Sequence, residues 1–105
     1  ALDTPGPTFI NVLSPCRLGW GFKPEDTIEL AREAVENCFW PLYEVENGVY
    51  KLTYKPKEKK PVVDWLKKQT RFRHLFKPGN EELLAKVQEY IDTEWEKLLQ
   101  KCGVE

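Results

Sequence analysis

Residues 42–54, LYEVENGVYKLTY, decide the local fold most clearly. The pair Asn47-Gly48 is typical of a two-residue type I′ turn, because both residues tolerate positive φ angles. Counting outward from the turn pairs Glu46 with Val49, Val45 with Tyr50, Glu44 with Lys51 and Tyr43 with Leu52. Apolar pairs alternate with a charged pair, so the turn and the face pattern agree on one register. We therefore expect a β-hairpin here.

A helical pattern precedes the hairpin. Pro24 suits a first helical position, and the apolar residues that follow recur at spacings of three and four. The expected stripe consists of Ile28, Ala31, Val35 and Cys38, widened by Ala34. Trp40-Pro41 marks the end, because the residue before a proline disfavours the helical conformation. The pattern predicts one amphipathic helix.

Two more helices are expected after the hairpin. Pro61 can open a short helix that runs to Gln69, and Asn80 is a good N-cap for a long final helix. Gly103 is expected to stop that final helix. Its apolar stripe consists of Leu84, Val87, Ile91, Trp95, Leu98, Leu99 and Cys102.

The N-terminal residues have a different pattern. A turn-rich lead delivers the chain into residues 8–13, whose nearly continuous apolar content predicts a strand buried on both faces, as in a parallel sheet. We therefore expect an α/β fold, or α+β as an isolated piece. Its parts are one buried core strand, a helix, a β-hairpin, a short helix and a long C-terminal amphipathic helix. Residues 1–54 and 55–105 are expected to form two sections of one globular unit.

Composition limits the class of protein. A chain of 105 residues with 41% hydrophobic and 31% charged residues fits one soluble globular domain. No apolar run approaches the roughly 20 residues that cross a bilayer, and no signal-peptide pattern is present, so we expect a cytoplasmic protein without a membrane partner. The chain contains no methionine and starts at Ala1, so we expect an excised or truncated piece.

Charge is unevenly distributed. The formal net charge is −1, yet residues 55–77 are rich in Lys and Arg and contain only Glu58 and Asp64 as acids. Residues 71–74, Arg-Phe-Arg-His, alternate cations with a ring of the kind that stacks on nucleic-acid bases. The chain as a whole is slightly acidic and lacks a nucleic-acid-binding signature. A solvated face or a charged subunit contact is therefore favoured, with no nucleic acid as partner.

Cys16 is the candidate for chemistry. It follows the expected strand at the carboxyl end, where open α/β sheets place their binding sites. Residues 16–22 are expected to form a loop, and its two glycines, Gly19 and Gly21, allow close approach of the backbone. A lone cysteine is more often simply buried, so the residue pattern by itself favours a structural role. Cys38 and Cys102 lie on apolar helical stripes and are expected to pack in the core. His74, the only histidine, lacks a second metal ligand at suitable spacing and is expected to be structural or solvent-facing.

Nine segments along the chain match one enzyme family. They are Gly6–Phe9, Leu13–Cys16, Thr27–Ala31, Ala34–Glu36, Phe39–Tyr50, Lys55–Lys57, Lys60–Val62, Gln69–Leu75 and Tyr90–Leu99. Taken in this order, they resemble the C-terminal portion of the beta subunit of pyruvate:ferredoxin oxidoreductase, also called pyruvate synthase.

The resemblance implies cofactors and a role for Cys16. In that family the beta subunit binds thiamine diphosphate with Mg2+ and holds a [4Fe-4S] cluster. The cysteine of the Ser14-Pro15-Cys16 segment is implied as one of the four cluster ligands. The other three ligands and the Gly-Asp-Gly segment of the thiamine site are not in this chain. They are expected in the remainder of the beta subunit, so the piece would be inactive alone.

The resemblance also implies a reaction and partners. The reaction is oxidative decarboxylation of pyruvate to acetyl-CoA and CO2, with electrons passed to ferredoxin, or the reverse synthesis. Pyruvate and coenzyme A would bind to the whole enzyme, which also contains alpha, gamma and delta subunits. Arg17 and Trp20 could tune the cluster potential through charge or burial.

Two alternatives remain open at this point. The substrate could be another 2-oxoacid, such as 2-oxoisovalerate, 2-oxoglutarate or indolepyruvate. The chain could instead be a docking module without chemistry, which binds a partner through its long final helix and its basic segment.

Overall fold

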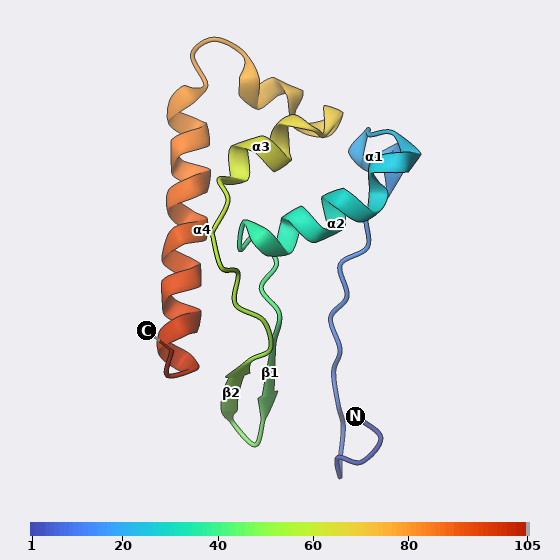
Figure 1. The fold of residues 1–105 in the computed structure, drawn as a ribbon, viewed down its shortest axis with the longest axis vertical. Coiled ribbons are helices and arrows are strands. Elements are labelled where there is room, and N and C mark those ends of the chain that lie inside the picture. Colours follow the sequence, from blue (N-terminus) through green and yellow to red (C-terminus); the bar gives the residue numbers. More distant parts are fainter. Residues whose placement is uncertain (105) are drawn as a thin grey trace.

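The computed structural model describes residues 1–104 and consists of helices and one two-stranded sheet. The elements are α1 (Arg17–Trp20), η1 (Pro24–Asp26), α2 (Thr27–Glu36), β1 (Tyr43–Glu46), β2 (Val49–Leu52), α3 (Val62–Lys67), η2 (Thr70–Phe76) and α4 (Glu81–Lys101). Figure 1 shows α4 along one side, α2 and the hairpin in the middle, and the N-terminal segment down the other side. This arrangement is the α+β form of the expected fold.

The core joins α2, α3 and α4 around Trp65. Its buried apolar residues are Trp20, Leu30, Ala34, Cys38, Val62, Trp65, Leu66, Ile91, Trp95, Leu98 and Leu99. The Trp65 side chain is only 1% exposed, and its indole N–H donates to the carbonyl of Leu30 at 2.9 Å. A buried indole needs such a partner, so this bond fixes α3 against α2.

The helix expected before the hairpin is confirmed as α2, and its expected buried stripe is correct only in part: Ala34 and Cys38 are buried, Ala31 and Val35 are half-buried, and Ile28 is exposed. Leu30 and Ala34 are completely buried, whereas Ile28 is 73% exposed. The spacing of four from Leu30 to Ala34 also defines a helix face, rotated from the expected one. Periodicity alone does not show which of two adjacent faces meets Trp65.

α2 ends at a left-handed residue that is not glycine. Cys38 has a φ of 66°, a conformation that helix C-termini usually give to glycine. The Asn37 side chain supports this end, because its Oδ1 accepts a hydrogen bond from the Phe39 amide at 2.9 Å. The Trp40 amide in turn donates to the Ala34 carbonyl at 2.9 Å. The bond from Trp40 gives a partner to a carbonyl that the end of the helix would otherwise leave without one.

The hairpin is confirmed in its turn and in its register. Asn47 and Gly48 have φ angles of 52° and 77°, as a type I′ turn requires. The pairs are Tyr43 with Leu52, Glu44 with Lys51, Val45 with Tyr50 and Glu46 with Val49. Tyr43 and Tyr50 stack with ring centroids 6.0 Å apart.

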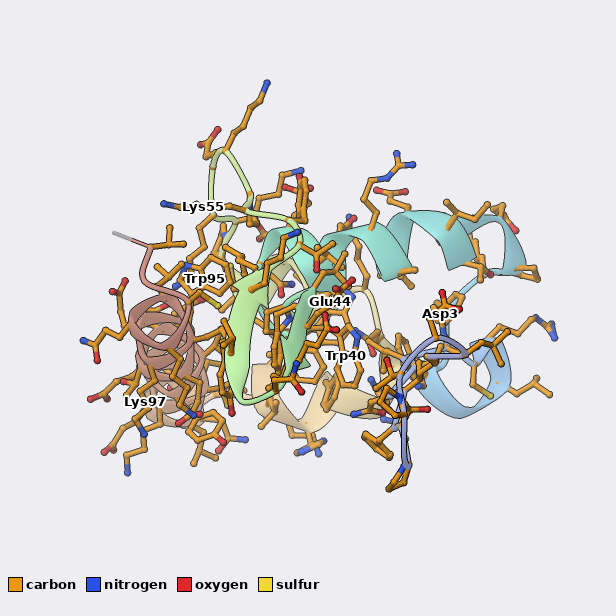
Figure 2. All side chains as sticks on the ribbon, turned by 90° about the horizontal axis from the view of Figure 1, so that it is seen from below. Asp3, Trp40, Glu44, Lys55, Trp95 and Lys97 are labelled. Carbon is orange, nitrogen blue, oxygen red and sulfur yellow. The ribbon has the colours of Figure 1, made fainter. Side chains whose placement is uncertain are left out.

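α4 is confirmed with its stripe and its stop. Ile91, Trp95, Leu98 and Leu99 are buried. Gly103 has a φ of 68°, and the amide of Val104 donates to the carbonyl of Leu99 at 2.9 Å, which is the bond of a Schellman motif. Figure 2 shows α4 beside the hairpin, with the segment that carries Asp3 on the hairpin's other side.

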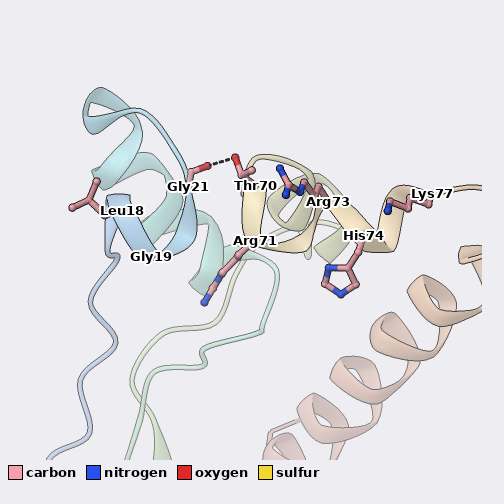
Figure 3. Close-up of a pocket in the computed structure, with 8 residues that line it drawn as sticks. All are labelled: Leu18, Gly19, Gly21, Thr70, Arg71, Arg73, His74 and Lys77. Atoms are coloured by element: carbon pink, nitrogen blue, oxygen red, sulfur yellow. Dashed lines mark hydrogen bonds between the residues drawn. The ribbon is translucent and has the colours of Figure 1, made fainter.

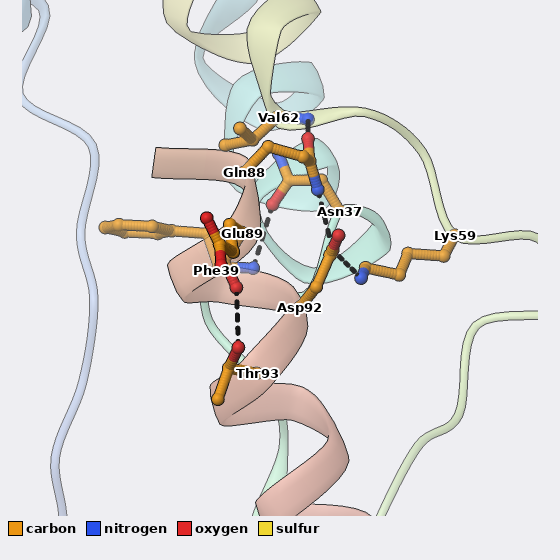
Figure 4. Close-up of polar contacts among 8 residues, drawn as sticks. All are labelled: Asn37, Phe39, Lys59, Val62, Gln88, Glu89, Asp92 and Thr93. Atoms are coloured by element: carbon orange, nitrogen blue, oxygen red, sulfur yellow. Dashed lines mark hydrogen bonds and ion pairs between the residues drawn. The ribbon is translucent and has the colours of Figure 1, made fainter. Parts of the chain in front are cut away.

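Polar contacts attach the linker after the hairpin to α4 (Figure 4). Lys59 forms an ion pair with Asp92, and Gln88 accepts a hydrogen bond from the Val62 amide at 2.8 Å. Burial alone would raise the pKa of Asp92, but hydrogen bonds from Lys59 and Gln88 outweigh burial and lower it. Asp92 is therefore held in its charged form at neutral pH.

The buried strand expected at residues 8–13 is not formed. The segment is extended, and Phe9, Ile10 and Val12 are 88%, 72% and 74% exposed. A strand needs a neighbour for its backbone hydrogen bonds, and the only sheet in residues 1–104 is the hairpin. None of the helices in residues 1–104 combines the length and apolarity needed to cross a bilayer.

Candidate functional site

The segment after the N-terminal residues forms a single helical turn, although the sequence predicts a loop there. Cys16 occupies the N-cap of α1, and its carbonyl accepts a hydrogen bond from the Trp20 amide at 2.8 Å. Gly21 ends the turn in the left-handed conformation with a φ of 75°. Trp20 is buried on the core side, while Arg17 and Leu18 are exposed. The turn thus presents Cys16 at the surface.

The Cys16 thiol is free and exposed. Its sulfur accepts a hydrogen bond from the Gly19 amide at 3.4 Å. A Cβ added at Gly19 would lie 3.4 Å from the same sulfur. Glycine therefore keeps the approach to the thiol open on this side. An accessible sulfur with an amide donor is chemically suited to bind a metal or to react.

The other two cysteines lie in different surroundings. Cys38 is 4% exposed, and burial raises the pKa of its thiol to about 11. Cys102 is half-buried and packs against the core at the end of α4. The prediction that these two cysteines pack in the core is confirmed, so Cys16 alone among the three is exposed.

The Cys16 turn is joined to the basic η2 segment by Gly21 and Thr70. The amide and the hydroxyl of Thr70 both donate to the Gly21 carbonyl, at 3.0 and 2.8 Å (Figure 3). A Cβ at Gly21 would lie 2.6 Å from the Cβ of Thr70, and its φ is positive, so only glycine fits this approach. Residues about 50 apart in sequence thereby become neighbours.

A cleft of about 560 Å³ lies between these two segments. Its lining residues are Leu18, Gly19, Gly21, Thr70, Arg71, Arg73, His74 and Lys77. Four of them carry basic side chains and none is acidic. The guanidinium of Arg71 lies 4.2 Å from the Trp20 ring, and its Nε donates to Gln69 at 2.8 Å. Partial burial lowers the pKa of Arg71, which stays protonated at neutral pH.

The basic side chains of this cleft have no carboxylate partner among residues 1–104. Lys59 and Lys68 of the basic segment pair with Asp92 and with Glu29 and Glu33. In contrast, no carboxylate of residues 1–104 lies within ion-pair distance of Arg71, Arg73 or Lys77. His74 is exposed, as expected.

The chain does not contain a complete metal site in its described part. No three His, Cys, Asp or Glu side chains of residues 1–104 come together as a group that could hold a metal ion. The surroundings of Cys16 therefore fit one thiolate ligand of a shared centre, and they do not fit a whole cluster. The role of Cys16 as a ligand stays a prediction.

Comparison with known proteins identifies the relatives of the chain. No family model matches it. Pyruvate synthase subunit PorB of Methanocaldococcus jannaschii is 52% identical over 92 residues, which cover 88% of this chain and 30% of that subunit. PorB of Thermotoga maritima is 48% identical over 100 residues, or 94% of this chain and 31% of the subunit. The chain is homologous to the C-terminal part of PorB.

A second group of relatives consists of ketoisovalerate oxidoreductase subunits. Ketoisovalerate oxidoreductase subunit VorB of Pyrococcus abyssi is 43% identical over 100 residues, which cover 93% of this chain and 31% of VorB. The chain thus spans about 30% of the length of the curated PorB and VorB relatives that it matches. The resemblance found in the sequence segments is confirmed by these matches.

The basic cleft was not predicted as a site beside Cys16. Its residues were recognised as a charged segment, but the contact between Gly21 and Thr70 that brings them to α1 has no sequence signal of its own. A second glycine after Cys16 was the only hint, since glycine marks places where backbone approaches closely.

Proposed function

We propose that this chain forms the C-terminal part of the thiamine diphosphate-binding beta subunit of a 2-oxoacid:ferredoxin oxidoreductase, in which Cys16 supplies one ligand of a [4Fe-4S] cluster. The observation that carries the proposal is the 52% identity to a pyruvate synthase subunit over most of the chain. A match that covers 94% of the chain includes position 16 wherever it begins. The free, exposed thiol of Cys16 supports its assignment as the ligand.

The proposed reaction is the oxidative decarboxylation of pyruvate to acetyl-CoA and CO2, or its reverse. Identity is higher to the PorB relative, at 52%, than to the VorB relative, at 43%, which favours pyruvate over ketoisovalerate. Another 2-oxoacid is the alternative. The proposed enzyme also contains alpha, gamma and delta subunits, and we place it in the cytoplasm. Coenzyme A takes up the acetyl group, and ferredoxin accepts the electrons.

The residues of this chain would act by holding and orienting a thiolate. When bound, thiamine diphosphate with Mg2+ supports decarboxylation of the 2-oxoacid, while an iron-sulfur cluster accepts its electrons singly. Cys16 would hold one corner of that cluster, with the Gly19 amide donating to its sulfur. Such N–H···S bonds stabilise negative charge on the ligand and help to set a reduction potential. The Trp20 side chain is buried in the core and holds the α1 turn against the rest of the chain.

The docking-module alternative lacks a comparable observation. Its long final helix uses Ile91, Trp95, Leu98 and Leu99 in the core of this chain, so that face is not free for a partner. Nucleic-acid binding is also disfavoured, because Phe72 is half-buried and lies under the Arg71 guanidinium, 4.5 Å from its ring centroid. That ring is not available to stack on a base.

The experiment is Cys16→Ser in the assembled enzyme, with Cys102→Ser as the matched control. We expect Cys16→Ser to lose the iron of one cluster, about four atoms, together with its electron paramagnetic resonance signal and ferredoxin reduction. Cys102→Ser should keep all three. Full iron content and an unchanged signal in Cys16→Ser would contradict the assignment.

A further inference from the structure

The helical turn α1, which carries Cys16 at its N-cap, is too short to be stable by itself. Within it the Trp20 amide donates to the Cys16 carbonyl at 2.8 Å, and the Gly21 amide donates to the Arg17 carbonyl at 3.0 Å. A single turn fixes several backbone dihedral angles for few hydrogen bonds, so it forms only where other contacts support it. The position of the Cys16 sulfur therefore depends on the residues that hold this turn.

Thr70 holds the turn at its C-terminal end. Its amide and its hydroxyl both donate to the Gly21 carbonyl, and Figure 3 shows the hydroxyl bond between the two segments. Two donors from one residue restrain the direction of this carbonyl as well as its distance. A Cβ added at Gly21 would lie 2.9 Å from the Thr70 hydroxyl oxygen, so the two segments are as close as glycine allows.

Trp20 attaches the same turn through its side chain. Its ring meets the ring of Trp65 edge to face, with centroids 5.8 Å apart, and the Arg71 guanidinium lies 4.2 Å from it. Trp20 and Trp65 both belong to the buried core. One backbone contact and one side-chain contact therefore join α1 to α3 and η2.

Gln69 fixes the start of η2, where Thr70 lies. The Gln69 side chain is 1% exposed. Its Nε2 donates to the Trp65 carbonyl at 3.1 Å, and its Oε1 accepts from Nε of Arg71 at 2.8 Å. A buried amide with partners at both ends is confined to one orientation. Thr70 therefore holds the Cys16 turn from a position that the core determines.

The Cys16 sulfur accepts its hydrogen bond from within this turn, at the Gly19 amide. Gly19 lies between Cys16 and the point that Thr70 holds, so a shift of the turn at Gly21 changes the N–H···S distance. We propose that Thr70 is a positioning residue, which keeps the Gly19 amide on the Cys16 sulfur and thereby raises the reduction potential of the cluster. The hold on the turn rests on the observed contacts, and the effect on the potential rests on the proposed function.

The test compares Thr70→Val with Thr70→Ser in the assembled enzyme. Valine has the shape of threonine without the hydroxyl, so it loses the 2.8 Å bond to Gly21, whereas serine keeps a hydroxyl for it. The matched control is Thr93→Val. It removes a hydroxyl that donates to the Glu89 carbonyl at 2.9 Å within α4.

Gly21→Ala disrupts the same contact from the other side. Its control is Gly48→Ala, because Gly48 has nearly the same φ, 77° against 75°, but open space around the added Cβ. Both variants strain the backbone, and only Gly21→Ala pushes against Thr70. Any effect on the Cys16 turn that is specific to Gly21→Ala therefore comes from the contact.

The first readout is hydrogen exchange of residues 17–22, followed by mass spectrometry. Thr70→Val should speed exchange of the Trp20 and Gly21 amides about fivefold, the effect of one lost hydrogen bond, and Gly21→Ala should speed it more. Thr70→Ser and both controls should stay within about twofold of the parent. Unchanged exchange in Thr70→Val, or equal exchange in Gly21→Ala and Gly48→Ala, would overturn the proposal.

The second readout is a redox titration of the electron paramagnetic resonance signal that Cys16→Ser removes. An N–H donor stabilises the negative charge of the reduced cluster. Thr70→Val should therefore lower the reduced-to-oxidised ratio at a fixed potential about threefold, which is about 30 mV for one electron. Thr70→Ser and Thr93→Val should keep the parent potential.

Faster exchange of the turn with an unchanged potential would overturn the positioning role, because Thr70 would then hold the turn without affecting the cluster. Retention of every signal in Cys16→Ser would instead contradict the proposed function, and with it the effect on the potential. The exchange measurement needs no cluster at Cys16, so it decides the hold on the turn in either case. The two failures are therefore distinguishable.

Discussion

The N-terminal limb (residues 1–12) and the helical body (α2, α3 and α4) differ in the solvent exposure of their apolar side chains. The limb exposes Phe9, Ile10 and Val12 to solvent, and no residue of it is buried. The body buries Leu30, Val62 and Trp65 almost completely within the same chain. Both regions are rich in apolar residues, so composition alone does not distinguish them.

The difference lies in where hydrogen-bond partners come from. A helix satisfies its backbone from within, and each of the three helices of the body needs only an apolar face to pack. An extended segment needs another strand beside it, and the limb has none within residues 1–104. The body therefore packs within this chain, whereas the limb has the sequence pattern of a strand and no strand beside it within residues 1–104. Cys16 lies at the junction of the two regions.

The largest expected effect comes from truncating one aromatic side chain in each region. Trp65→Ala should lower the free energy of unfolding by about 3–5 kcal/mol, because it removes the centre of the core and the indole bond to Leu30. Phe9→Ala should change it by less than about 0.5 kcal/mol, since the ring is exposed. Urea unfolding of both variants measures the contrast. Equal losses would show that the limb is packed.

Thiol accessibility is the next comparison. At pH 8 we expect iodoacetamide to alkylate Cys16 about a hundredfold faster than Cys38, which is buried and has its pKa raised to about 11. Mass spectrometry of timed samples gives both rates from one reaction. Comparable rates would mean that the end of α2 opens readily, and the body would then not be the more protected region.

Alkaline pH should lower the free energy of unfolding by a smaller amount, through the buried Cys38 thiol at the end of α2. A solvated thiol, whose pKa is 9.0, loses its proton in the unfolded chain, while native Cys38 keeps its proton up to about pH 11. The unfolded state therefore binds fewer protons in this interval, and the free energy of unfolding falls as pH rises.

The measurement compares the parent chain with Cys38→Ala at pH 8 and pH 10. The parent should lose about 1 kcal/mol more than the variant over this interval. Cys16→Ala serves as the control and should follow the parent, because its thiol is exposed in both states. If the parent and Cys38→Ala lose the same unfolding free energy between pH 8 and pH 10, burial does not raise the pKa of Cys38.

Local signals predicted the hairpin and the end of α4. The Asn47-Gly48 turn fixed the hairpin register, and Gly103 marked the end of α4, because each depends on residues adjacent in sequence. The rotation of α2 was missed since it depends on Trp65, which comes from another helix. The left-handed Cys38 was missed as well, because its support comes from the Asn37 side chain rather than from glycine.

The candidate site was predicted only in part. Cys16 was singled out by its position and by resemblance, and its exposure is compatible with the assignment. The single helical turn that presents it was not predicted, nor was the cleft that Thr70 closes against Gly21. Both depend on long-range contacts, which periodicity and spacing do not encode.

Hydrogen exchange tests the contrast between limb and body most directly. In the isolated chain, amides of residues 8–12 should exchange within about tenfold of unprotected rates, while buried amides of α2 and α4 are slowed about a thousandfold or more. In the assembled enzyme the same limb amides should become protected by a neighbouring strand. Protection of the limb in the isolated monomer, or continued rapid exchange after assembly, would contradict this account.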